Sequence, residues 1–151
     1  MKRLLPEHLP QLLAQPTFSA RSSYVALASA FGNSRSELDA VLAQDDSMQF
    51  VDDECAPALL LSLHAVDRVQ GHARVQLHGK DERGALPAFL QRLSSQFALT
   101  RLYSYVFPHE TTEIAQLRAL GFVPEACFRQ HLFVDGAYAD LQVFGLVTDT
   151  P

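Results

Sequence analysis

The chain has 151 residues, of which 48% are hydrophobic and 19% charged, with a formal net charge of -5 at pH 7. A chain of this length can bury roughly 68–70% of its unfolded surface, so this composition predicts one folded domain over residues 1–151 rather than a disordered chain. The negative charge and the lack of a lysine and arginine cluster argue against a nucleic-acid groove and against an anionic membrane surface.

Targeting and metal-binding signals are also missing from the sequence. The basic pair Lys2-Arg3 precedes no apolar segment typical of a signal peptide, and no stretch approaches the roughly 18 apolar residues of a membrane span. Cys55 and Cys127 have no metal-ligand spacing, which favours buried or inert thiols in a reducing compartment. We therefore expect a cytoplasmic protein with no metal site.

The first part of the chain predicts a strand, helices and two further strands. The strand ends near Leu4-Leu5, and proline and hydroxyl or amide caps suggest where the helices begin. The remaining elements are a helix over about 6–14, an ambiguous apolar run over 24–31, a helix that begins between 33 and 36, and strands over 48–51 and 58–63.

Residues 72–78 alternate between apolar and polar side chains. Ala73, Val75 and Leu77 fall on one side of such a strand, and the histidine, arginine and glutamine positions between them fall on the other. A period of two is typical of a strand with one buried and one polar face. A helix over 86–99 follows, because its apolar residues recur at helical spacing.

The last third of the chain predicts a strand, a short helix and a hairpin. Residues 101–107 are rich in aromatic and β-branched side chains, and Pro108 ends that strand. A helix with a threonine hydroxyl cap and a first-turn carboxylate then begins at Thr111 and ends at Gly121, in a left-handed cap. Asp135-Gly136 predicts a tight turn between strands over 127–134 and 141–147.

These last residues resemble a known family. The segment PHETTEIAQLRALGF at 108–122 is similar to the P-x-N-x-x-S-x-x-(L/Y)-x-x-x-G-F segment of the GNAT acyltransferases. The run RQHLFVDGAYAD at 129–140, followed by VFGL at 143–146, resembles the ending of the GNAT branch that acetylates ribosomal-protein N-termini and antibiotics. The resemblance implies a mixed α/β (α+β) fold with two splayed central strands, here over 72–78 and 101–107.

The resemblance also implies a cofactor. In that family the thioester of an acyl-CoA, usually acetyl-CoA, lies between the splayed strands, and its pyrophosphate lies at the N-terminus of the next helix. Here that helix would begin at Gly84. The residues implied to contact the cofactor are Leu77, Gly79, Lys80, Arg83, Gly84, Ala85 and Glu110.

The cofactor loop departs from the family pattern in length and charge. It is about three residues short, and it carries two carboxylates, Asp81 and Glu82, which would repel phosphate or would instead stabilise the helix N-terminus without any ligand. Glu110 replaces the family's asparagine and can only accept hydrogen bonds when ionised. Leu117 stands where relatives often carry a tyrosine that protonates the leaving thiolate.

His72 is the candidate general base for acyl transfer, because it lies on the polar face of its strand and an imidazole titrates near neutral pH. The alternative is a structural strand histidine, which is the commoner case. Tyr103 and Tyr105 share one side of their strand, where core packing is favoured over substrate stacking. Asp140 is expected to be a structural hydrogen-bond anchor.

Two functions follow from this resemblance. The first is an acyl-CoA-dependent N-acyltransferase that acts on a primary amine of a small molecule or peptide by direct attack. The second is a GNAT-fold protein that has lost acetyl-CoA binding and serves as a binding or assembly protein, or acts on a different ligand. The long apolar strands at the end of the sheet also predict a homodimer, since they would otherwise leave an exposed edge.

Overall fold

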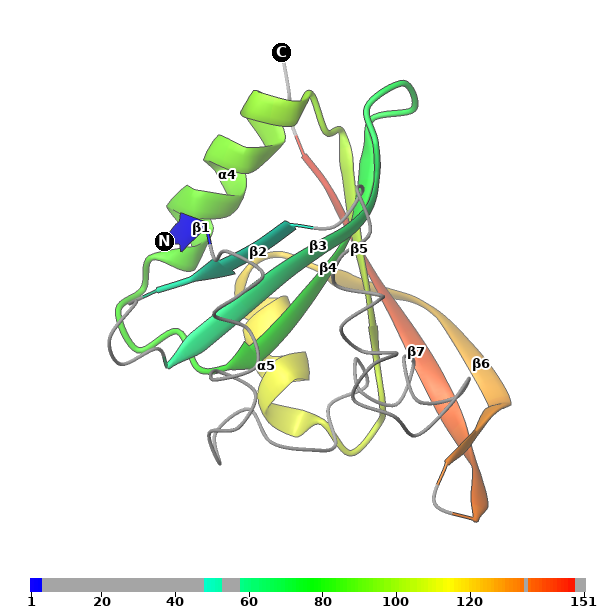
Figure 1. The fold of residues 1–151 in the computed structure, drawn as a ribbon. Helices are drawn as coiled ribbons and strands as arrows, with labels where there is room; N and C mark the ends of the chain where they lie inside the picture. The colour runs from blue at the N-terminus through cyan, green and yellow to red at the C-terminus, as the bar shows by residue number, and fades with distance from the viewer. Residues whose placement is uncertain (4–47, 53–57, 135, 149–151) are drawn as a thin grey trace.

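A computed structural model describes residues 1–3, 48–52, 58–134 and 136–148 (Figure 1). The predicted helix over about 6–14, the ambiguous apolar run over 24–31 and the helix predicted to begin between 33 and 36 lie outside the described residues, as do Cys55 and Asp135. The predicted single domain over 1–151 therefore stays a prediction for the chain as a whole.

The described strands form one mixed seven-stranded sheet in the order β1-β2-β3-β4-β5-β7-β6. Its β4–β5 pair is parallel and every other neighbouring pair is antiparallel. The strands are β1 (Lys2–Arg3), β2 (Met48–Val51), β3 (Leu59–Asp67), β4 (His72–Gly79), β5 (Arg101–Val106), β6 (Val123–Val134) and β7 (Ala137–Val147). The strands predicted around 48–51, 58–63, 72–78 and 101–107 are confirmed, and those of the hairpin are longer than predicted.

Two helices are described, α4 (Leu86–Phe97) and α5 (Thr111–Ala119), and both contribute to one hydrophobic core. The core includes Ala73, Val75 and Leu77, so the predicted alternation along β4 is confirmed on its apolar side. On the other side Gln76 is buried as well, which the alternation did not predict.

The helix ends match the predictions in part. Helix α4 begins at Leu86, as the apolar spacing predicted, and not at Gly84, the start that the resemblance implied. It ends at Phe97, two residues before the predicted end, because Ala98 adopts a left-handed conformation with φ of 53°. The threonine cap predicted for α5 is wrong: Glu110 is the N-cap residue and its side chain does not bond to the helix amides. The left-handed Gly121 that follows α5 is confirmed, with φ of 90°.

The β6–β7 hairpin extends away from the two helices at one edge of the sheet (Figure 1). An irregularity in its pairing lies between Phe128 and Leu132, where Gln130 has φ of 50°. The carboxylate of Asp140 accepts a hydrogen bond from the Gln130 amide at 2.8 Å. The structural role predicted for Asp140 is thereby confirmed.

Candidate functional site

Strands β4 and β5 pair over three residues only and then separate. Their parallel ladder ends at the pair formed by Arg74 and Tyr103, although β4 continues to Gly79 and β5 to Val106. Strand β4 remains paired with β3 through Gly79, and β5 with β7 through Val106. The expected splay of the two central strands is therefore confirmed (Figure 1). It begins after Arg74, where the ladder ends.

A buried glutamine bridges the two strands just beyond this point. The carboxamide of Gln76 donates from Nε2 to the backbone carbonyl oxygen of Tyr105 at 3.1 Å, and the residue is 1% exposed. Its register partner in β3 is Ser62, which is also buried. A side-chain bond thus joins the strands where the backbone ladder has ended.

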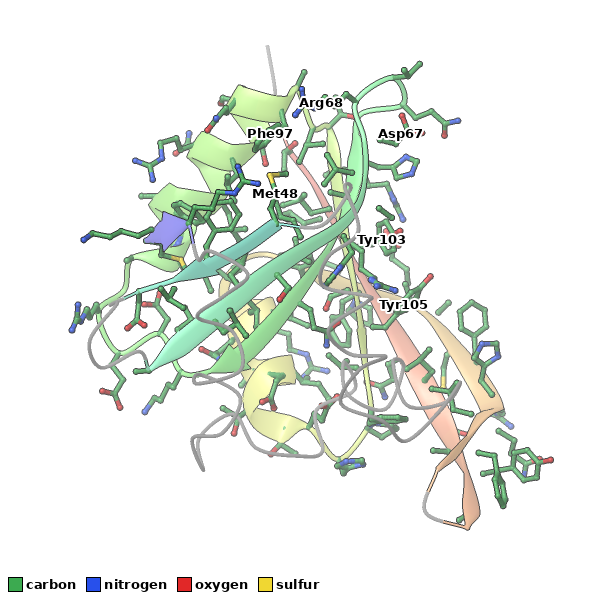
Figure 2. All side chains as sticks on the ribbon, viewed as in Figure 1. Met48, Asp67, Arg68, Phe97, Tyr103 and Tyr105 are labelled. Atoms are coloured by element: carbon green, nitrogen blue, oxygen red, sulfur yellow. The ribbon has the colours of Figure 1, made fainter. Side chains whose placement is uncertain are left out.

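Aromatic and basic side chains follow the polar side of β4 and β5. The ring centroids of His72 and Tyr103 lie 6.2 Å apart, and those of Tyr103 and Tyr105 lie 5.7 Å apart. The Arg74 guanidinium lies 5.9 Å from the ring centroid of Tyr105. Figure 2 shows the two tyrosines following one another along β5, and each is half-buried. They provide an apolar surface with polar tips beside the point of separation.

Burial raises the pKa of Tyr103, and the neighbouring Tyr105 raises it further while Arg74 lowers it. The usual value is 10.0. The phenol of Tyr103 is therefore neutral at physiological pH, where it can donate a hydrogen bond but does not act as a base.

The predicted base, His72, lies at the start of β4. It is half-buried and its register partners are Asp67 in β3 and Arg101 in β5. This position is in the paired part of the ladder, two residues before Arg74. The structure therefore brings His72 beside Tyr103, and its role as a base stays a prediction.

The N-terminus of α4, where a pyrophosphate was expected, is capped by the chain itself. One carboxylate oxygen of Asp81 accepts from the Ala85 amide at 3.0 Å and the other from the Leu86 amide at 2.8 Å. The next residue is Pro87, which has no N–H to offer a ligand. These are the bonds expected of a carboxylate that stabilises a helix N-terminus.

A second side chain, that of Gln116 in α5, forms hydrogen bonds with the backbone just before α4. Its Nε2 donates to the carbonyl oxygen of Gly79 at 2.8 Å, and its Oε1 accepts from the Asp81 amide at 2.9 Å. The Lys80 amide donates to the carbonyl of Ala58 at 3.0 Å. Much of the backbone from the end of β4 to the start of α4 is thus bonded within the protein.

Two carboxylates lie at the N-terminus of α5. Glu110 is 6% exposed, and its Oε2 accepts a hydrogen bond from the Phe107 amide at 2.7 Å. Burial raises the pKa of Glu113, and Glu110 raises it further. Glu110 therefore closes the turn between β5 and α5 in the described structure, and a cofactor contact from it stays a prediction.

The other predicted cofactor residues lie in different environments. The side chain of Leu77 is in the core, so its backbone alone could meet a ligand. Lys80, Arg83 and Gly84 are exposed in the loop, and Gly84 has φ of 62°. The sequence gives no signal for Gln76 and Gln116, because glutamine carries no motif and both contacts join residues at least 29 positions apart.

Metal and membrane features are not found within the described ranges. No group of three or more histidine, cysteine or acidic side chains there could hold a metal ion. Neither α4 nor α5 is long and apolar enough to cross a membrane. Cys127 is an exposed free thiol in β6, contrary to the buried alternative.

Comparison with known proteins gives structural neighbours only, since no protein-family profile and no curated protein sequence matches the chain. A dodecameric spermidine N-acetyltransferase from Vibrio cholerae, in an intermediate state, aligns over 97% of this chain and 91% of its own, with a TM-score of 0.67 and 18% identity. The enzyme of that organism in complex with CoA and spermine aligns over 97% and 93%, with a TM-score of 0.66 and 15% identity.

At these identities the likeness shows the fold. The neighbours do not support the resemblance to the ribosomal-protein branch, because they are spermidine N-acetyltransferases. The mixed seven-stranded sheet and its two described helices have the GNAT fold, as the last third of the sequence predicted.

Proposed function

We propose that the protein is an N-acyltransferase that moves an acyl group, most simply acetyl, from acyl-CoA to a primary amine of a small molecule. The observation that carries this proposal is the separation of β4 and β5 after Arg74 and Tyr103. It leaves the later backbone groups of β4 outside the β4–β5 ladder, where the amides of an acyl-pantetheine arm can bond. Similarity of fold to enzymes that acetylate spermidine, one of them in complex with CoA and spermine, supports the same chemistry.

The proposed reaction is direct attack without a covalent enzyme intermediate. The amine nitrogen attacks the thioester carbonyl, a C–N bond forms, and the C–S bond breaks as the thiolate leaves. His72 accepts the proton from the attacking amine, directly or through a water molecule, as histidine commonly does in general-base catalysis. The neutral phenol of Tyr103, beside His72, can donate a hydrogen bond to the acceptor.

A titration followed by turnover tests this proposal. We expect calorimetric binding of acetyl-CoA in the micromolar range and release of free CoA thiol when spermidine is added as the amine probe. Initial rates measured at several concentrations of both substrates should give intersecting rather than parallel reciprocal plots, because no acyl-enzyme forms. The absence of binding and of turnover at millimolar acetyl-CoA would contradict the proposal.

The second candidate is a GNAT-fold binding or assembly protein that does not take acetyl-CoA. The bonds from Asp81 to the Ala85 and Leu86 amides favour it, because they occupy the helix end where a pyrophosphate would bind. The same titration separates the two functions. For a protein of this second kind we expect no calorimetric binding of acetyl-CoA or CoA, and no release of thiol when spermidine is added with acetyl-CoA.

A further inference from the structure

The side chains of Asp81 and Gln116 bond to the backbone where the nucleotide end of an acyl-CoA is expected, and their contacts are continuous. Gln116 bonds to the carbonyl of Gly79 and to the amide of Asp81, and Asp81 in turn bonds to the amides of Ala85 and Leu86. The set runs from the end of β4 to the first turn of α4. We call these contacts of Asp81 and Gln116 the internal clasp.

The clasp uses the groups that a diphosphate would need. Helix N-termini bind phosphate through their first backbone amides and the positive end of the helix dipole. In α4 two of those amides already donate to a carboxylate, and Pro87 supplies none. A phosphate oxygen would have to displace the Asp81 carboxylate and would meet its negative charge at close range, which is unfavourable.

The proposed position of acyl transfer, where β4 and β5 separate, lies outside the clasp. Strands β4 and β5 separate after Arg74 and Tyr103, five residues before Gly79 on β4. The contacts of the clasp involve backbone from Gly79 onward. The clasp therefore obstructs the nucleotide half of an acyl-CoA and leaves the acyl end of the path unaffected.

We infer that Asp81 determines donor specificity: the protein holds its thioester by the acyl-pantetheine arm and gains little from the nucleotide diphosphate. This inference rests on the proposed acyltransfer. The donor class is accordingly an S-acyl-pantetheine thioester, with or without an attached nucleotide. Transfer from either donor is the same step, in which the amine nitrogen bonds to the acyl carbon, the C–S bond breaks, and the proton lost by the amine ends on the released thiol.

The first test compares two donors with the unmodified protein. S-acetylpantetheine and acetyl-CoA are supplied with spermidine, and release of the thiol is followed. We expect kcat/KM values within about threefold of each other, because two of the amides that would bind phosphate already donate to Asp81. A preference for acetyl-CoA greater than about tenfold would overturn the inference while leaving the acyltransferase function intact.

The second test opens the clasp and measures binding of CoA by calorimetry. Asp81→Ala should tighten CoA binding by at least about tenfold, because two backbone amides that bond to the carboxylate become available to phosphate. Glu82→Ala removes the same charge from an exposed position one residue later in the loop and should change binding less than about twofold. Equal effects in the two variants would show that net charge alone matters and would overturn the inference.

A third variant covers the possibility that Asp81→Ala does not fold. Asp81→Asn keeps the shape and one acceptor oxygen, and it should give a smaller gain in the same direction, with circular dichroism to verify the fold. If no donor is turned over by any variant, the proposed function fails. The comparison of CoA binding between the variants at 81 and Glu82→Ala still decides the role of the clasp.

Discussion

The first-turn carboxylate of α5, Glu113, is half-buried, and burial together with Glu110 raises its pKa above the usual 4.5. A raised pKa in the folded state means that the charged form is disfavoured by folding. The neutral carboxyl group of Glu113 therefore costs the folded state no stability at pH values below the unfolded-state pKa. Stability is lost as the pH rises through the folded-state pKa and the group ionises. Glu113 therefore opposes folding at neutral pH.

Replacing Glu113 with glutamine should stabilise the protein at pH 7 and have little effect near pH 3.5, because glutamine does not ionise. Thermal denaturation followed by circular dichroism at the two pH values checks this. Glu82→Gln, at an exposed position, is the control and should show no such pH dependence. A Glu113→Gln variant that is less stable than the parent at pH 7 would contradict the prediction.

A second prediction at this scale concerns the base. His72→Gln should lower kcat for spermidine acetylation by about 10²-fold or more, the contribution typical of general-base catalysis. The measurement is the initial rate of thiol release. His109→Gln, at an exposed turn position, is the matched control and should retain the rate. An unchanged rate in His72→Gln would exclude this residue as the base.

At the scale of elements, the turn before β4 and the loop before α4 both contain a glycine with positive φ. Gly71 has φ of 70°, and a Cβ there would lie 2.9 Å from the Thr100 hydroxyl oxygen and 3.1 Å from the Ala98 carbonyl oxygen. The Gly71 carbonyl also accepts from the Thr100 and Arg101 amides, which ties the turn to the start of β5. At Gly84, with φ of 62°, a Cβ would meet nothing within 4 Å.

Substitutions at these two glycines therefore distinguish the cost of backbone strain, which both share, from the cost of steric crowding, which only Gly71 has. Gly84→Ala should lower the free energy of unfolding by about 1 kcal/mol, the cost of a left-handed alanine. Gly71→Ala should cost about 1–3 kcal/mol more, because the backbone carbonyl of Ala98 is not free to move away. Urea denaturation of both variants measures the difference, and equal losses would mean that the turn relaxes to admit the methyl group.

At the scale of the whole molecule, β6 forms one edge of the sheet and its hairpin carries exposed aromatic side chains. Phe133 and Tyr138 are 61% and 67% exposed, with ring centroids 5.1 Å apart. An edge strand with apolar side chains is an open site for pairing with another chain. The predicted homodimer, formed through this hairpin, stays our proposal.

Sedimentation velocity at micromolar concentration should give the mass of a dimer for the unmodified protein. Phe133→Asp should shift it to a monomer, because a charge would be buried at the proposed contact. Val69→Asp introduces the same charge at an exposed valine in the turn between β3 and β4 and should leave the dimer unchanged. A monomeric unmodified protein would contradict the proposal.

Much of the element pattern follows from the sequence, since it depends on neighbours within a few residues. Alternation over 72–78 predicts β4, and the apolar spacing over 86–99 predicts the start of α4 and places its end to within two residues. Gly121 predicts the end of α5 because glycine favours a left-handed conformation. The placement of the two splayed strands came from the resemblance of the last third to a family.

Only the tertiary structure decided which side chains bond to the loop before α4. The sequence showed that Asp81 stands before a helix, and it left open whether this carboxylate repels a ligand or replaces one. The bonds of Asp81 to the Ala85 and Leu86 amides favour replacement, and Gln116 reaches the same loop from 35 positions away in the chain. Local periodicity fixes helices and strands, whereas hydrogen bonds between distant segments depend on the packing that brings those segments together.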